Sequence, residues 1–211
     1  METLATTKNF DLSALIKRAK LVILSPKECW QTISQETHTP KELLRSTIVP
    51  LMLAGILCST VGMQVFGMNI GPLGTWRPPL VQHLLSQIVF GIVGVCMIFV
   101  GSFILQKLAE FFQGTVSSDR AFSLLVHAML PMLIGNLLAI YPLLGIFGIV
   151  FLIISLCALY WGTPVMTTVA SNKALGYAAA FVVTMILAWI VVSGASALLV
   201  GLPQPPLATT P

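Results

Sequence analysis

Five long runs without any Asp, Glu, Lys or Arg decide what this chain can fold into. The runs cover residues 47–68, 84–105, 121–140, 142–161 and 176–200. A helix of about 20 residues rises about 30 Å, which is the thickness of the hydrocarbon core of a bilayer. Charged side chains are costly at that depth, so their absence is what insertion into lipid requires. The sequence therefore predicts an all-α integral membrane bundle of five transmembrane helices.

The composition agrees with lipid as the main solvent. Hydrophobic residues make up 56% of the chain and charged residues only 9%, against about 25% charged residues in a typical soluble domain. The four cysteines show no C-x-x-C spacing, and three of them lie inside apolar runs, where a thiol behaves as a small hydrophobic group. We therefore expect the bilayer as a partner, with no metal, no cofactor, no nucleic acid and no identifiable small-molecule substrate.

The cations are distributed unevenly between the two sides of the predicted bundle. Seven of the eleven Lys and Arg residues precede the first run, and three more lie in the connections after the second and fourth runs. The opposite side has only Arg77. Positive loops mark the cytoplasmic side. We expect a cytosolic N-terminal segment at 1–46, a membrane domain at 47–200 and a non-cytoplasmic tail at 201–211.

The N-terminal segment predicts amphipathic helices ahead of the membrane. Residues 10–24 have apolar positions at helical spacing beside a basic face. This helix either lies in the headgroup region as an anchor that senses anionic lipid or packs against the protein's own bundle. S-P-K-E at 25–28 and T-P-K-E at 39–42 are both capping-box patterns with Pro at the first helical position. The first predicts a helix of about three turns, with Trp30 and Ile33 on one side, and the second begins the helix that enters the membrane.

Aromatic residues at the predicted span ends indicate the membrane interfaces. We expect Trp76 and Tyr141 at the outer interface, and Trp161 and Tyr177 near the inner one.

A polar face on the third run is the main candidate functional feature. Arg120, Ser123 and His127 are spaced by three and four residues and therefore share one helical face, with Pro131 next in line. Pro131 leaves a backbone carbonyl near His127 without its usual donor. This face could line a small vestibule in which His127 responds to protons. The competing interpretation, which we favour, is a neutral His127 hydrogen-bonded within the bundle.

Other polar and small residues within the runs predict contacts between helices. Asn136 lies on the opposite side of its helix from His127, so the two cannot form one site there. We expect Asn136 to bond another helix, and we interpret Gln64 and Gln87 in the same way. Gly94 and Gly101 share a face of the second run, which favours close helix packing.

Several short motifs resemble the Yip (Ypt-interacting protein) domain family of polytopic membrane proteins, particularly its bacterial members. The motif residues are Pro26, Trp30, Ile33 and Glu36 in P-x-x-x-W-x-x-I-x-x-E, Pro50 at the start of the first span, and Gly114 followed by the mid-span Pro131. The resemblance implies five spans, a cytosolic N-terminus and, for a bacterial member, the inner (cytoplasmic) membrane. Eukaryotic members are linked to small GTPases and vesicle traffic, but the bacterial ones imply no agreed activity and no catalytic residues.

The leading functional hypothesis is a non-enzymatic membrane scaffold or adaptor, with a second copy or another membrane protein as its possible partner. The helix that carries Trp30 and Ile33 is the first place to look for such a partner. The alternative is a small transporter or channel whose pathway lies beside Arg120, Ser123 and His127. An enzyme is disfavoured because no nucleophile–base pair or metal-ligand pattern accompanies His127.

Overall fold

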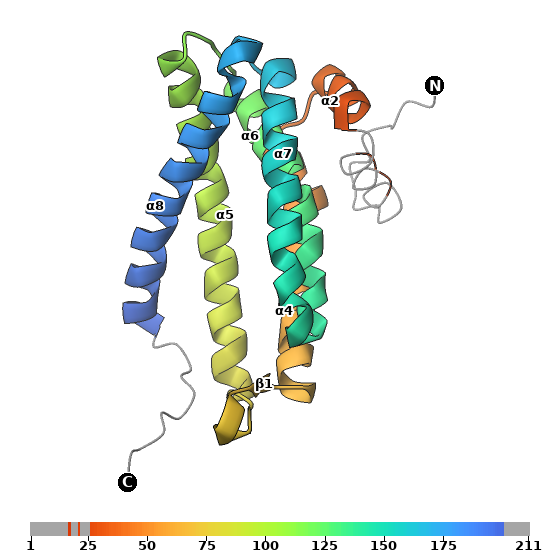
Figure 1. Ribbon diagram of the computed structural model, residues 1–211, viewed down its shortest axis with the longest axis vertical. Coiled ribbons are helices and arrows are strands. Elements are labelled where there is room, and N and C mark those ends of the chain that lie inside the picture. The colour runs from red at the N-terminus through yellow and green to blue at the C-terminus, as the bar shows by residue number, and fades with distance from the viewer. Residues whose placement is uncertain (1–16, 18–20, 22–25, 201–211) are drawn as a thin grey trace.

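The computed structural model describes residues 17, 21 and 26–200, and the chain is an all-α integral membrane bundle (Figure 1). Five of the described helices are long and apolar enough to cross a membrane. They are Pro40–Val65, Leu80–Phe111, Ser118–Ile140, Pro142–Met166 and Ser171–Val192. The predicted five-span class is therefore confirmed. Most of the predicted helix at 10–24 and the whole tail at 201–211 lie outside the described residues.

The two capping patterns lead into two successive helical segments. Helix α2 (Pro26–Gln35) is followed, after a short linker, by α3 (Pro40–Leu43), a π-helical turn η1 (Leu44–Ile48) and α4 (Val49–Val65). The capping box at Thr39 is complete, because its hydroxyl accepts from the Glu42 N–H at 3.3 Å and the Glu42 carboxylate accepts from the Thr39 N–H at 3.1 Å. The π-helical turn ends just before Pro50, which has no N–H for the normal helical hydrogen bond.

A small hairpin joins the first two spans. Strands β1 (Met68–Asn69) and β2 (Thr75–Trp76) pair antiparallel around the 3₁₀ turn η2 (Gly71–Leu73). Arg77 donates from Nε to the Gln64 carbonyl at 3.0 Å and from Nη2 to the Val65 carbonyl at 3.1 Å. These bonds satisfy the last carbonyls of α4, as a cation at a helix C-terminus does.

The remaining spans contain long α-helices with short 3₁₀ segments at some of their ends. They are α5 (Leu80–Phe111), α6 (Ser118–Gly135) with η3 (Asn136–Ile140), η4 (Pro142–Phe147) with α7 (Gly148–Met166), and η5 (Ser171–Lys173) with α8 (Ala174–Val200). The Ser117 side chain caps α6 by accepting from the Arg120 N–H.

Helix α6 is the centre of the bundle. It packs against α5 on one side and α7 on the other, while α8 lies beside α5 and α4 lies along α6 and η3 (Figure 1). Half of the residues in the most apolar window of its span are buried, against 17–28% in the other four spans. A helix enclosed in this way can carry serine and histidine because protein groups, and not lipid, surround them.

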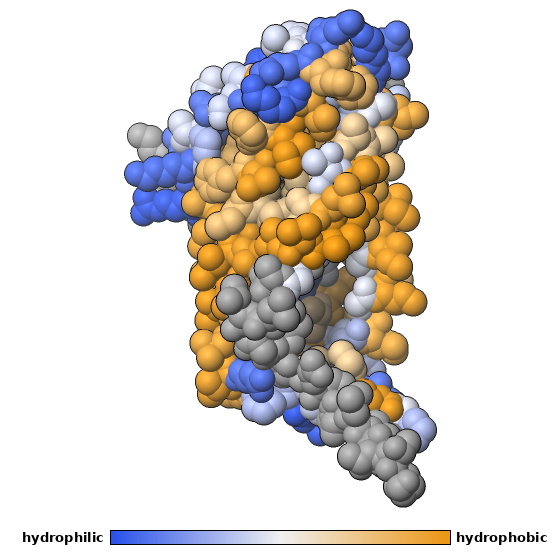
Figure 2. All heavy atoms as spheres, turned by 90° about the vertical axis from the view of Figure 1, so that its left-hand side faces the viewer, coloured by the Kyte–Doolittle hydropathy of each residue, from blue (hydrophilic) through white to orange (hydrophobic). Residues whose placement is uncertain are grey.

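The outward surface divides into an apolar band and polar ends. Figure 2 shows the band on the side of α8, with hydrophilic residues gathered toward the ends of the molecule. Leu57, Val81 and Leu143 are among the exposed apolar side chains, as expected for residues that face lipid. Tyr177, which was expected near the inner interface, is fully buried and donates its hydroxyl to the Leu105 carbonyl at 2.7 Å.

Candidate functional site

The apolar face of α2 is packed onto the end of the bundle opposite the hairpin (Figure 1). Trp30 and Ile33 are 0% and 1% exposed, and Cys29 is also buried. A Cβ at Gly162 of α7 would come within 2.6 Å of the Trp30 ring and 2.7 Å of Leu124 on α6. The absence of a side chain at Gly162 therefore lets the indole lie directly against α7, with Leu124 alongside.

The predicted polar face of α6 reaches α2 through Arg120. Its Nη2 donates to the carbonyl of Ser34, near the C-terminus of α2, at 3.2 Å. The last carbonyls of a helix carry partial negative charge and have no intrahelical donor. The Arg120 guanidinium satisfies one of them and connects α2 to the start of the central helix.

A buried group of polar side chains lies where the linker after α2 meets α6, and we call it the α2–α6 polar cluster. It consists of Glu36, His38, Ser123 and His127. His38 Nε2 lies 2.6 Å from Glu36 Oε2, and the His38 and His127 rings are 5.6 Å apart between centroids at a tilt of 37°. His127 is 1% exposed and His38 is 7% exposed. The two histidines are therefore enclosed between the linker and α6, while the Glu36 side chain stays 12% exposed.

The hydrogen bonds of His127 restrict what this group can do chemically. Its Nδ1 lies 2.8 Å from the Ser123 carbonyl and 3.3 Å from the Ser123 hydroxyl. A carbonyl can only accept, so Nδ1 carries the proton and donates it. The same nitrogen then cannot take a proton from the Ser123 hydroxyl, as the base of a serine nucleophile must. The close pair of Ser123 and His127 is thus not arranged as a nucleophile and its base.

Pro131 continues the same face, and the residue that follows it is bonded to α7. The N–H of the next residue, Met132, donates to the Ser155 hydroxyl of α7 at 3.1 Å. A proline inside a helix disturbs the ladder of hydrogen bonds around it, and a hydroxyl on a neighbouring helix can satisfy a freed group. Ser155 fills this role and fastens α7 to the centre of the bundle.

The structure brings most of the predicted residues together and adds one that the sequence did not suggest. Ser123 and His127 are in contact, whereas Arg120 lies at the rim and contacts α2 instead of the histidine. His38 was not recognised, because it lies in a linker and shares no metal-ligand or helical spacing with His127. The described residues contain no group of three or more His, Cys, Asp or Glu side chains placed to hold a metal ion.

The loops at the α2 end are also connected to one another. The Thr168 hydroxyl accepts from the Thr115 N–H at 2.6 Å, and the Thr168 N–H donates to the Thr115 carbonyl at 3.0 Å. A Cβ at Gly114 would meet the Val169 backbone nitrogen at 2.8 Å. Lys173 donates to the Gln113 side chain at 2.6 Å. The connections after α5 and after α7 therefore form one braced surface.

The motif residues hold this arrangement together. Pro26 begins α2, Trp30 and Ile33 bury its inner face, Glu36 joins the α2–α6 polar cluster, and Pro50 follows the π-helical turn. The chain matches the Yip1 domain across residues 20–192, which include all of these positions. Comparison with curated proteins and with solved structures gives no match. The match spans most of the chain and five membrane helices, and the protein belongs to the Yip1 domain family of multi-pass helical membrane proteins.

Proposed function

We propose that this protein is a non-enzymatic membrane adaptor that binds a segment of another membrane protein at its α2 end. The observation that carries the proposal is a cavity of about 280 Å³ between α2 and the adjoining end of α7. Gln31 lines it from α2, and Tyr160, Trp161 and Pro164 line it from α7. Tyrosine and tryptophan are enriched among the residues that dominate binding energy in protein interfaces. We call this cavity the α2–α7 groove.

The contacts of α2 explain why the groove would keep its shape. Trp30 and Ile33 are buried against the bundle, so they hold α2 in place and are not themselves available to a partner. The outward residues Glu28, Gln31 and Thr32 are exposed. Binding to a preformed groove costs less conformational entropy than binding that must first order a mobile helix. The partner contact is therefore expected beside α2, on its polar side and in the groove.

The proposed orientation places the α2 end in the cytoplasm. Lys107 in the last turns of α5, Arg120 in the first turn of α6 and Lys173 in η5 lie at the same end as α2. Arg77 directly follows the hairpin at the other end. An excess of cations favours the cytoplasmic side. For a bacterial member, the location would be the inner membrane.

The alternative of a transport pathway along α6 receives less support from the geometry. Ser123 and His127 are 4% and 1% exposed, and the linker residue His38 covers the histidine. A conducting pathway needs polar groups that line a continuous aqueous route. The buried cluster is better explained as a connection that fixes the linker to α6.

A photocrosslinking amino acid at Gln31 tests the adaptor proposal. In cells, we expect a discrete protein adduct at this position and none at the same probe placed at Thr75, in the hairpin. Trp161→Ala should reduce the adduct at least fivefold, because it removes an aromatic wall of the groove. Phe111→Ala is the matched control, since Phe111 is an exposed aromatic residue at the same end of the bundle that does not line the groove.

Two results would contradict the proposal. One is a Gln31 probe that reacts only with lipid. The other is an adduct whose yield falls equally in Trp161→Ala and Phe111→Ala, because the groove would then have no special part in the contact.

A further inference from the structure

A second and larger cavity lies within the membrane-spanning part of the bundle. Its volume is about 700 Å³, and residues from α4, α5, α6, α7 and α8 line it. Figure 2 shows a recess in the apolar band on the side of α8. Pockets that enclose small organic ligands have volumes of about 300–1,000 Å³. This cavity, which we call the intramembrane pocket, is therefore large enough for a ligand.

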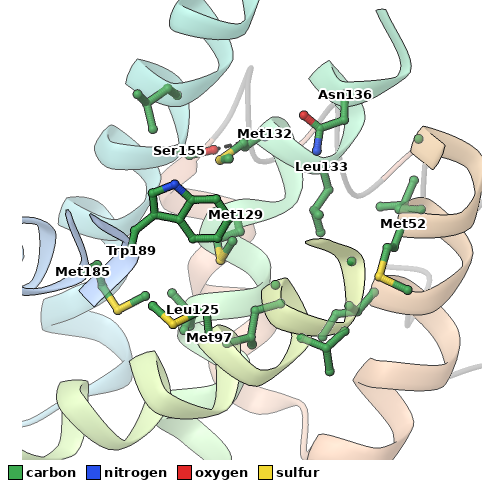
Figure 3. A pocket seen from close by; sticks show the side chains of 18 of the residues that line it. Met52, Met97, Leu125, Met129, Met132, Leu133, Asn136, Ser155, Met185 and Trp189 are labelled. Atoms are coloured by element: carbon green, nitrogen blue, oxygen red, sulfur yellow. Dashed lines mark hydrogen bonds between the residues drawn. The ribbon is translucent and has the colours of Figure 1, made fainter. Parts of the chain in front are cut away.

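The pocket wall is apolar and adaptable. Five of the nine methionines in the chain line it: Met52, Met97, Met129, Met132 and Met185. Their side chains approach the space from four different helices, together with Trp189 of α8 (Figure 3). Methionine side chains are flexible and polarisable, and they suit surfaces that adapt to the shape of an apolar partner. The described residues that line the pocket include no Asp, Glu, Lys, Arg or His.

Some of the polar groups on the wall are paired within the protein. Gln87 donates to the Ser59 hydroxyl at 2.6 Å, and the Ser155 hydroxyl accepts from the Met132 N–H. Asn136 was expected to bond another helix, but no hydrogen bond joins its exposed side-chain amide to the described residues, and its Cβ lies against Gly55 of α4. The amide lies at one end of the pocket (Figure 3). An occupant with oxygen acceptors near that end would accept hydrogen bonds from the amide N–H groups.

Helix packing leaves the intramembrane pocket open at Gly94 of α5. Its spacing from Gly101 predicted a shared packing face, and Gly101 does lie against Leu125 and Met185. Gly94 lines the intramembrane pocket instead, and a Cβ there would meet no atom within 4 Å. This position therefore opens directly into the cavity.

We propose that the intramembrane pocket binds one acyl chain of a bilayer phospholipid from the leaflet opposite to α2. The uncharged wall excludes the headgroup, and the pocket lies at a depth where hydrocarbon is the surrounding solvent. From Leu125 to Asn136 the pocket extends about 16 Å along the helix at 1.5 Å per residue. Asn136 lies close to the end of the span at Ile140, where ester oxygens of that leaflet reach the interface. The amide donates to those oxygens while the chain extends toward Leu125.

Photolabelling from the bilayer tests this site independently of the adaptor proposal. The full-length protein is reconstituted into phosphatidylcholine vesicles that contain phosphatidylcholine with a diazirine on one acyl chain, and labelled peptides are mapped by mass spectrometry. We expect label on Met129 and Met132 of the central helix that saturates as the probe fraction rises. Label on the lipid-facing residues Leu143 and Ile146 should instead rise in proportion to the probe.

Filling the pocket provides the decisive comparison. Gly94→Phe should lower the saturable label on Met129 at least fivefold and leave the label on Leu143 unchanged. Gly148→Phe is the matched control, because a Cβ at Gly148 also meets nothing within 4 Å but the residue does not line the pocket. Gly94→Leu serves as a smaller filling variant if the phenylalanine variant does not fold. Asn136→Leu should lower the saturable label severalfold.

The proposal would be overturned by equal labelling of Met129 in Gly94→Phe and Gly148→Phe. It would also be overturned by the absence of acyl label on Met129 in the unmodified protein. The second pattern is the one expected if another copy of the chain, and not lipid, covers the pocket. Labelling of Met129 that never saturates would likewise count against a defined site.

Discussion

Single residues fasten α2 to the bundle, and Gly162 is the clearest example. The Trp30 ring, which is fully buried, occupies the space that a side chain at position 162 would need. Large aromatic side chains contribute much of the apolar area buried in a contact. Any side chain at position 162 therefore competes directly with the indole.

Gly162→Val should loosen α2 without removing any atom of that helix. Overpacking a tight contact costs about 1–3 kcal/mol, which corresponds to an increase of about 5- to 150-fold in the opened population. The buried thiol of Cys29, 3% exposed, reports the opening. We expect maleimide labelling of Cys29 to accelerate by that factor in a variant whose other three cysteines are alanine.

Gly148→Val provides the control on the same helix, since its new side chain enters open space. Equal labelling rates for Cys29 in the two variants would show that the contact between Trp30 and Gly162 does not hold α2 in place.

Ser155 is a second residue whose role depends on a neighbour. Ser155→Ala leaves the Met132 N–H without its hydroxyl partner, so we expect the free energy of unfolding to fall by about 0.6–2 kcal/mol. In a Pro131→Ala background the helix can restore its own ladder, and the effect of Ser155→Ala should then be smaller. The free energy of unfolding is measured in mixed micelles for the unmodified protein, the two single variants and the double variant.

Thr184→Ala is the matched control for the loss of a hydroxyl, because the Thr184 hydroxyl donates only within its own helix to Ala180. Its effect should be smaller than that of Ser155→Ala. A Ser155→Ala effect that is the same with and without Pro131 would contradict the coupling between the two residues.

At the level of elements, the sequence predicted the spans well and their ends less well. Charge-free runs and the T-P-K-E capping box located the helices, because hydrophobic insertion and capping are local properties of the chain. Helix α5 continues to Phe111, past the predicted end at 105, since Gln106, Lys107 and Glu110 are good helix formers even though they are polar.

The candidate site was only partly predictable for a related reason. Helical spacing correctly brought Ser123 and His127 together. No local pattern could indicate that His38, far away in sequence, lies on the His127 ring, or that Tyr177 turns inward to the Leu105 carbonyl. Such contacts depend on how α2 and α8 pack against the bundle, which is a tertiary property.

The braced loops at the α2 end are held together by a hydrogen bond between Thr115 and Thr168. Thr168→Val removes the oxygen that accepts from the Thr115 N–H at 2.6 Å and leaves that amide without its partner. A lost hydrogen bond of this kind costs about 1–1.5 kcal/mol, so hydrogen exchange at Thr115 should accelerate about tenfold. Thr168→Ser keeps the oxygen and should exchange at the original rate. Equal exchange in both variants would contradict the bracing role.

For the whole molecule, the two ends differ in construction as well as in charge. The α2 end joins three separate parts of the chain through hydrogen bonds of Arg120, Thr168 and Lys173. The described part of the other end has a hairpin closed by Arg77 and the turn at Tyr141, whose ring packs edge-on against Phe66. The braced end is therefore better suited to hold a partner in a fixed geometry, and its proposed cytoplasmic location follows from its cations.

Labelling from one side of the membrane tests that location. Gln35→Cys places a thiol on the exposed side of α2, and Thr75→Cys places one in the hairpin, each in a background whose native cysteines are alanine. A membrane-impermeant maleimide added to intact cells should label Thr75→Cys and leave Gln35→Cys unmodified until the cells are opened. The variant Arg77→Gln should give the same labelling pattern. Ten cations are assigned to the α2 side and only Arg77 to the other, so removing Arg77 hardly changes the charge difference between the two sides. Labelling of Gln35→Cys in intact cells, with protection of Thr75→Cys, would reverse the proposed orientation and place the α2–α7 groove outside the reach of any cytosolic partner.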